Sequence, residues 1–290
     1  MTRYLKLLRP HQYTKNGFVL LGVLFAGRWD IATLIAAAIV FVAFCAMSSA
    51  VYVLNDILDI DADRHHPLKK NRPLANGSVS VKTAWSISAC LACIGLLLAL
   101  AVSMWAGIFL LTYALLNIGY SWRWKHVVVL DVFIISAGFM LRIMAGTVGL
   151  GIPPSSWLLV CSLMLTLFLG FAKRRAELLF LENGKPEDRA LTRPVLGDYS
   201  PMMIEQFMSI SAACTILSYS LYTVSPETIA KHGTSALIYT VPIVVYGVFR
   251  YIFLLHKSNS GNDTASDLYT DPHLFIVVIA WIVTTAAILA

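Results

Sequence analysis

The sequence has little charge. Only 13% of its 290 residues are Asp, Glu, Lys or Arg, against roughly a quarter in an average soluble domain. Hydrophobic residues make up 58% of the chain and are grouped in runs of membrane-spanning length, separated by short loops. This composition excludes a soluble enzyme. We expect an all-α polytopic membrane protein, with residues 1–290 forming a single transmembrane domain.

Cysteines are also few. There are five, an odd number, and all of them lie inside apolar segments, so the sequence offers no disulfide framework. The pair Cys90-x-x-Cys93 lies in an apolar run without a second pair, which favours packing over zinc or redox chemistry. A net charge of +6 without a continuous basic stripe on a soluble surface argues against nucleic-acid binding.

Nine apolar segments are near the ~20 residues that cross a ~30 Å hydrocarbon layer. The first is the weakest, because Lys15 and Asn16 interrupt it. A signal peptide is the alternative there, but no A-x-A-like cleavage site follows and the next span begins almost at once. We therefore predict a bundle of nine helices, at residues 11–27, 31–57, 83–101, 104–121, 128–149, 154–174, 202–223, 233–255 and 272–290.

The basic residues predict the orientation of the bundle. With the N-terminus in the cytoplasm, 19 of the 22 Lys and Arg residues fall on the cytoplasmic side. Arg28 and Lys231 fall on the opposite side, and Arg142 lies within a span. This bias follows the positive-inside rule. We expect a plasma (inner) membrane protein with a cytoplasmic N-terminus, a C-terminus on the opposite side, and its chemistry on the cytoplasmic face.

An acidic cluster lies at the cytoplasmic end of the second predicted span. If the helix continues, Asn55, Asp59 and Asp63 follow at i, i+4 and i+8, with Asp56 three residues before Asp59. Carboxylates at the end of a membrane helix repel one another, and a bound cation neutralises their negative charge. Oxygen-only ligands suit Mg²⁺ bridged to a phosphate. We predict all four as metal ligands and Asp56 and Asp59 as catalytic; a solvated acidic loop is the alternative.

Basic and phenolic side chains near the same predicted face are candidates for phosphate binding. In the run Lys69-Lys70-Asn71-Arg72 the candidates are Lys69 and Arg72, and in Lys173-Arg174-Arg175-Ala176-Glu177 they are Lys173 and Arg174. Between the fourth and fifth spans we select Tyr120 as a hydroxyl donor and Lys125 as a point charge. For Arg175, membrane anchoring is the preferred interpretation.

Three residues near or within spans are further candidates. Arg142 lies in the middle of a span, where arginine is costly and indicates a functional site, such as one for a lipid phosphate. An ion pair with Asp131 is the alternative, but 11 residues of helix place the two about three turns apart. Lys15 either lines the same pocket or reaches the membrane surface. Tyr52, one turn before Asn55, either binds a ligand or packs.

The run Asn55-Asp56-x-x-Asp59-x-x-x-Asp63, followed by Asn71-Arg72-Pro73, resembles the first motif of the UbiA superfamily of intramembrane prenyltransferases. The resemblance implies nine helices around a central cavity, with Mg²⁺-bound diphosphate at its cytoplasmic mouth. Most of the superfamily carries a second aspartate-rich motif after helix six. This chain has Lys173-Arg174-Arg175-Ala176-Glu177 there instead, which argues against ordinary aromatic prenylation.

Four further segments together resemble the decaprenyl-phosphate phosphoribosyltransferase branch: Leu8 to Asn16, Tyr120 to His126, Gly138 to Gly146 and Lys173 to Glu177. The implied substrates are 5-phosphoribosyl 1-pyrophosphate and a polyprenyl phosphate. The implied product is a polyprenyl-phosphoryl ribose 5-phosphate, which is a precursor of cell-wall sugars. The resemblance also implies ligand or metal contacts by Lys15, Tyr52, Asn55, Asp59, Lys69, Lys125, Arg142 and Lys173.

The charges suit this chemistry, because two anionic substrates must meet and a metal centre with fixed cations screens their repulsion. One alternative is a Mg²⁺-dependent prenyltransferase that moves a prenyl group from a prenyl diphosphate to an aromatic or haem-like acceptor. A second is a lipid-binding or transport protein, which has no use for the Asp56/Asp59 pair. The expected partners are the two phosphate substrates and the membrane, and the sequence allows a homo-oligomer.

Overall fold

The computed structural model describes residues 2–65, 69–183, 194–257 and 270–289. Within these ranges the regular structure is entirely helical, as predicted, and the chain is a multi-pass membrane protein. The segment Ser258 to Asp263 has the composition of a linker, and it lies outside the described residues. Eight segments are long and apolar enough to span a membrane: α3 (Ile31–Leu58), α5 (Val81–Val102), α6 (Met104–Trp122), α7 (Leu130–Ala145) with η4 (Val148–Leu150), α8 (Ser156–Asn183), α10 (Pro201–Val224), η6 (Ala236–Thr240) with α12 (Val241–Lys257), and α14 (Pro272–Leu289).

These eight agree with eight of the nine predicted spans, and the ninth is a correction. Residues 11–27 form no single long helix; instead, a 3₁₀ helix, η1 (Pro10–Leu20), is followed by the short α2 (Leu21–Ala26). Asn16 in η1 is fully buried and donates to Ser48 Oγ at 3.3 Å. Side-chain hydrogen bonds of this kind fix a tight segment that its apolar composition alone does not predict.

The contacts of the chain divide it into two compact units. Unit 1 comprises Met1–Val23, Asp30–Trp124 and Leu141–Pro153, and unit 2 comprises Leu24–Trp29, Lys125–Met140 and Pro154–Ala290. The chain passes from one unit to the other five times, and two of these crossings fall within α-helices, α2 (Leu21–Ala26) and α7.

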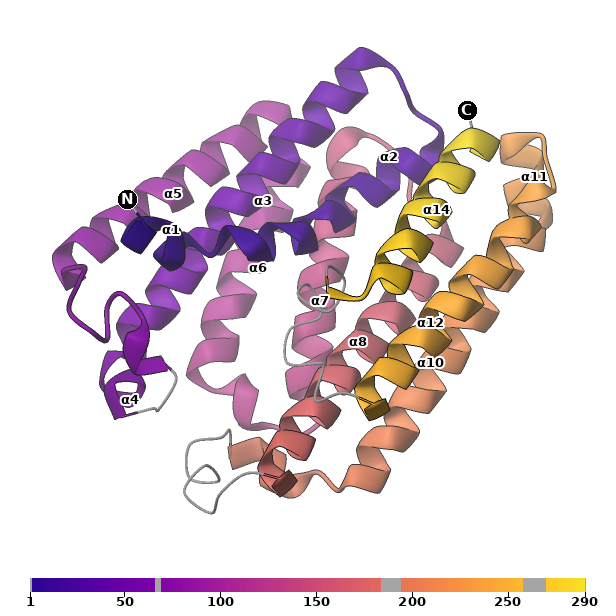
Figure 1. Ribbon diagram of the computed structural model, residues 1–290. Coiled ribbons are helices and arrows are strands. Elements are labelled where there is room, and N and C mark those ends of the chain that lie inside the picture. The colour runs from indigo at the N-terminus through magenta and orange to yellow at the C-terminus, as the bar shows by residue number, and fades with distance from the viewer. Residues whose placement is uncertain (1, 66–68, 184–193, 258–269, 290) are drawn as a thin grey trace. The chain divides into compact units, whose positions relative to one another are not determined.

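In unit 1, α3 lies beside α5, and α6 packs against both (Figure 1). Polar residues begin these helices as N-caps: Asp30 accepts from Thr33 N ahead of α3, and Ser80 accepts from Thr83 N ahead of α5. Each cap satisfies a backbone donor that a helix start otherwise leaves unpaired. Unit 1 also contains the short elements α1 (Thr2–Leu8), α4 (Ile60–His65) and η2 (Lys69–Asn71).

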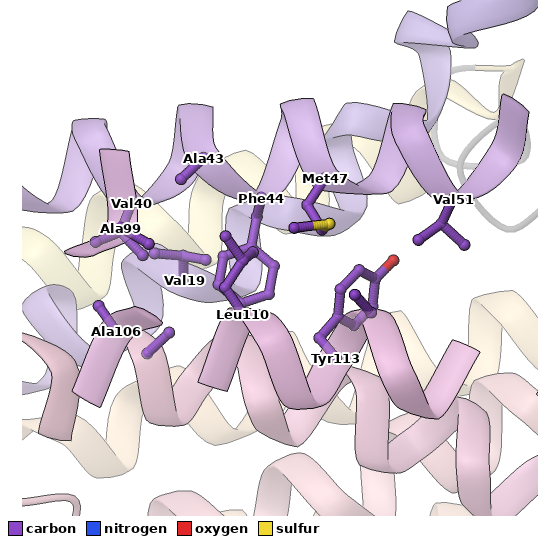
Figure 2. Packing of buried hydrophobic residues seen from close by; sticks show 12 residues of the cluster. Val19, Val40, Ala43, Phe44, Met47, Val51, Ala99, Ala106, Leu110 and Tyr113 are labelled. Atoms are coloured by element: carbon purple, nitrogen blue, oxygen red, sulfur yellow. The ribbon is translucent and has the colours of Figure 1, made fainter. Parts of the chain in front are cut away.

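The core of unit 1 lies between α3 and α6. Figure 2 shows Phe44 and Met47 of α3 facing Leu110 and Tyr113 of α6, with Val19 of η1 beside them. The segment that carries Val19 approaches residue 146 so closely that a Cβ on Gly146 would lie 1.8 Å from the Val19 carbonyl oxygen. Only glycine allows two backbones to meet at that distance.

Unit 2 is built on α8, α10, α12 and α14 together with the first part of α7. It also contains the short η5 (Pro194–Asp198) and α11 (Pro226–His232), and η3 (Trp124–His126) precedes α7 where the chain enters the unit. Its main apolar cluster lies between α8 and α10 and includes Phe168, Phe171 and Met208. A second cluster joins Phe25, Tyr222 and other aromatic residues. Many of the large apolar side chains that remain exposed belong to membrane-spanning helices, where the hydrocarbon layer is the solvent.

Candidate functional site

The acidic cluster lies where α3 ends. The α-helix stops at Leu58, Asp59 forms a turn, and α4 begins at Ile60. The i to i+4 hydrogen bonds nevertheless continue: Asp59 N donates to Asn55 O at 2.9 Å, and Asp63 N donates to Asp59 O at 2.8 Å. The helix is therefore interrupted at Asp59, but the predicted i+4 spacing of the polar residues is kept.

Two of the four predicted metal ligands are already paired with arginines. Asp56 is only 2% exposed, and its Oδ1 accepts from Arg9 at 2.5 Å and from Arg72 at 3.0 Å. Arg72 also donates to Asp63 Oδ2 at 2.7 Å. Within the described ranges, no three His, Cys, Asp or Glu side chains lie close enough to hold one metal ion. The structure therefore gives Asp56, Asp63 and Arg72 ion-pair partners within the protein.

Asn55 and Asp59 have different surroundings. Ser121 of α6 donates to the Asn55 Oδ1 at 2.8 Å and so orients the amide. Asp59 is partly exposed, and its carboxylate has no ion pair among the described residues. The Asn55 amide oxygen and the Asp59 carboxylate lie one helical turn apart, and both are hard oxygen donors of the kind that Mg²⁺ prefers. Protein sites for Mg²⁺ need only one or two carboxylates, because phosphate and water complete the coordination shell of the ion. This pair fits a magnesium ion.

The other candidates of unit 1 lie on α3, α6, η1 and η2. Tyr52 is one turn before Asp56 on α3, and the Arg9 guanidinium lies 5.2 Å from its ring centre. Lys15 is half-buried on η1 and donates to the side chain of Gln12. Tyr120 is half-buried on α6, and Lys69 is exposed in η2.

Arg142 is held deep in unit 1 and is 5% exposed. Its Nε donates to Asn16 Oδ1 at 2.8 Å, its Nη2 donates to Tyr113 OH at 3.0 Å, and its guanidinium lies 4.4 Å from the Tyr113 ring centre. Lys15 and Tyr52 interact electrostatically with the same tyrosine. Arg142 therefore belongs to a buried polar group that joins η1, α6 and α7.

In unit 2, Arg174 is engaged in buried ion pairs. It is fully buried, its Nε donates to Asp131 Oδ2 at 2.6 Å, and its Nη1 donates to Glu177. Tyr199 donates to the other oxygen of Asp131 at 2.7 Å. Two carboxylates of unit 2 therefore neutralise the charge of Arg174.

The Asp131 carboxylate also affects Tyr199, which lies outside the spans. Burial, together with the hydrogen bond to Asp131, raises the pKa of the Tyr199 phenol well above its usual value, so the phenol stays protonated and remains a donor. The two remaining candidates of unit 2, Lys125 in η3 and Lys173 on α8, are both half-buried.

The sequence interpretation missed several of these residues. Arg9, Ser121 and Tyr113 received no role, although each contacts a predicted site residue. Arg9 and Ser121 lie in two of the segments that carry the family resemblance, Leu8 to Asn16 and Tyr120 to His126, and this was their only signal in the sequence. Tyr113 is an ordinary helix residue, and only its spatial neighbours distinguish it.

Comparison with known proteins gives consistent results. The profile of the UbiA prenyltransferase family matches residues 17–279. The chain is 34% identical to a decaprenyl-phosphate phosphoribosyltransferase of Corynebacterium glutamicum, over 96% of this chain and 84% of the relative. It is 31% identical to a decaprenyl-phosphate phosphoribosyltransferase of Mycolicibacterium smegmatis, over 98% of this chain and 91% of the relative.

The fold is similar to that of a solved structure of a UbiA homologue from Archaeoglobus fulgidus bound to GPP and Mg²⁺. The TM-score is 0.72 at 18% identity, and the match covers 99% of each chain. At this identity the likeness concerns the fold alone, and it confirms the predicted helical architecture.

Proposed function

The chain belongs to the UbiA prenyltransferase family, and on that premise we propose that it transfers 5-phosphoribose from 5-phosphoribosyl 1-pyrophosphate to a polyprenyl phosphate, releasing pyrophosphate. The observation that carries the proposal is similarity over nearly the whole chain to two relatives named for this activity. The replacement of a second aspartate-rich motif by Lys173-Arg174-Arg175-Ala176-Glu177 supports a donor other than a prenyl diphosphate. The distribution of basic residues supports a cytoplasmic N-terminus in the plasma membrane.

We assign the magnesium ion to Asn55 and Asp59, the two oxygen donors of the acidic cluster that are not engaged by arginines. Ser121 fixes the orientation of the Asn55 amide. When bound, Mg²⁺ would stabilise the negative charge that develops on the pyrophosphate leaving group. The presence of Mg²⁺ in a solved structure of similar fold is consistent with this assignment.

The fixed cations would gather the two anionic substrates. In this proposal Lys15 and Lys69 of unit 1 neutralise the pyrophosphate and the 5-phosphate, Tyr52 and Tyr120 donate hydrogen bonds to them, and Arg142 holds the lipid phosphate. The phosphate-binding roles of Lys125 and Lys173 in unit 2 rest on the sequence resemblance alone. The bond between ribose C1 and the pyrophosphate oxygen breaks, and pyrophosphate leaves with the electron pair. A lipid phosphate oxygen then forms the new bond to C1. This oxygen is ionised near neutral pH, so the reaction needs no general base.

The experiment is incubation of purified protein with labelled phosphoribosyl pyrophosphate, polyprenyl phosphate and Mg²⁺, followed by mass spectrometry of the lipid fraction. We expect label in a lipid of the mass of polyprenyl-phosphoryl ribose 5-phosphate. Asp59→Asn should abolish its formation, whereas the control Asp61→Asn, at a side chain that is 91% exposed, should retain it. Absence of labelled lipid, with consumption of a prenyl diphosphate in a parallel incubation that also contains an aromatic acceptor, would establish a prenyltransferase and refute the proposal.

A second variant tests the assignment of the lipid phosphate. Arg142→Lys keeps the positive charge but loses the planar fork that reaches both Asn16 and Tyr113. We expect KM for polyprenyl phosphate to rise about tenfold, as one lost charge-assisted hydrogen bond implies, while KM for the ribose donor changes little. Equal changes in KM for both substrates would contradict the assignment of Arg142 to the lipid-phosphate site.

A further inference from the structure

The pairing of the acidic cluster divides its four members into two sets. An α-helix turns about 100° per residue, so Asp56 and Asp63, seven residues apart, lie within about 20° of each other around the axis. Asn55 and Asp59 lie about 40° apart, and all four side chains fall within an arc of about 100°. Arg72 contacts both members of the first set, at 3.0 and 2.7 Å. The cluster is therefore one polar stripe whose members differ in their partners: arginines for Asp56 and Asp63, and Ser121 for Asn55.

Asp56 is the more heavily engaged of the two arginine-bound acids. Both Arg9 and Arg72 donate to the same oxygen, Oδ1, and the side chain is 2% exposed. A divalent cation on this carboxylate would sit beside two guanidinium groups and be repelled by both. Arg9 is fixed further by its position over the Tyr52 ring and by a left-handed backbone conformation (φ 53°).

The ion pairs join three segments that are distant in sequence. Arg9 lies between α1 and η1, Asp56 and Asp63 lie at the junction of α3 and α4, and Arg72 follows η2. An apolar cluster joins the same parts of unit 1 and consists of Leu7, Val53, Leu74, Val79 and Ala84. The cluster gives the ion pairs a packed apolar support, which holds the arginines in one geometry.

From these contacts, and resting on the proposed function, we infer that Asp56 and Asp63 are positioning residues rather than metal ligands. They anchor Arg9 and Arg72 in what we call the arginine clamp (Arg9, Asp56, Asp63 and Arg72). The clamp fixes the end of α3, so that Asn55 and Asp59 face the metal ion, and it holds the segment that carries Lys69 close to the pyrophosphate.

Metal binding without turnover provides the test. Mn²⁺ is titrated into purified protein with inorganic pyrophosphate, and binding is followed by electron paramagnetic resonance. Asp59→Asn, which removes a ligand, should raise the Mn²⁺ Kd at least about tenfold. Asp56→Asn and the control Asp61→Asn should each leave it within about threefold of wild type. Mn²⁺ binding that Asp56→Asn weakens as much as Asp59→Asn does would overturn the inference.

Kinetics supply the second readout. Asp56→Asn should raise KM for phosphoribosyl pyrophosphate about tenfold with a smaller change in kcat, because the anchored cations lose their geometry. Arg9→Gln removes only one contact to Asp56, so it should shift KM in the same direction by less. The double variant Asp56→Asn/Arg72→Gln should raise KM by less than the product of the two single effects, because the two single variants share the Asp56–Arg72 contact, while the Asp56–Arg9 contact is lost only with Asp56.

Additive effects in that double variant would contradict the clamp. Failure of the wild-type protein to label the lipid would refute the proposed function, whereas the Mn²⁺ titration does not depend on turnover. The two outcomes are therefore distinguishable.

Discussion

Replacement of Arg174 by Met provides the sharpest test of the electrostatics of unit 2. Arg174 and Asp131 are both fully buried, and their closest atoms are 2.6 Å apart. At a charge separation of about 4 Å and an effective dielectric constant of about 20, their attraction is about 4 kcal/mol. The second partner, Glu177, is 20% exposed and contributes less, because water screens it.

Arg174→Met leaves the Asp131 carboxylate buried, with the Tyr199 hydroxyl as its remaining hydrogen-bond donor. Breaking a buried pair in this way costs about 3–5 kcal/mol. We expect the midpoint of thermal unfolding in detergent to fall by roughly 6–20 °C, using about 2–4 °C per kcal/mol. The double variant Arg174→Met/Asp131→Leu should recover much of the loss, because no uncompensated charge remains buried.

The control is Arg64→Gln, which breaks an exposed pair with Asp61 at 3.2 Å. An exposed pair contributes about 1 kcal/mol or less, so the unfolding midpoint should barely move. A result in which Arg174→Met unfolds like the wild type but loses transferase activity would refute the reasoning. It would return Arg174 to the phosphate-binding role that the sequence predicted.

Three further outcomes are expected. Gly146→Ala should lower the free energy of unfolding by about 3 kcal/mol or more, because the new Cβ meets the Val19 carbonyl. The control Gly17→Ala has open space around the new Cβ, so it should not destabilise the fold through a clash. Thermal unfolding measures both variants. Tyr199→Phe should cost about 1–3 kcal/mol in the same assay, since it removes the hydrogen bond to buried Asp131. Chelation of divalent ions should abolish lipid labelling, and added Mg²⁺ should restore it; activity that survives chelation would contradict the magnesium assignment.

The fold was largely predictable because hydropathy is a local property. A run of about 20 apolar residues must satisfy its backbone internally in a membrane, so it forms a helix wherever it packs. Eight predicted spans follow this rule. The segment 11–27 departs from it, because buried contacts of Asn16 and the close approach of Val19 to Gly146 shape it, and both depend on partners remote in sequence.

The candidate site was predictable only in part. The sequence determined which residues carry oxygen donors and charge at the end of α3, and the helical repeat set their i+4 spacing. It did not determine which charges neutralise one another. Arg9 lies 47 residues from Asp56, and Arg174 lies 43 residues from Asp131.

Only the tertiary structure decided these pairings. The strength of an ion pair depends on a separation of a few ångströms and on burial, which lowers the local dielectric constant. Neither quantity can be derived from the amino-acid sequence alone. The sequence thus determined that this chain is a helical membrane protein with acidic and basic residues near the ends of its apolar runs. Its three-dimensional packing decided that Asp56 and Asp63 pair with arginines and that Asn55 accepts a hydrogen bond from Ser121.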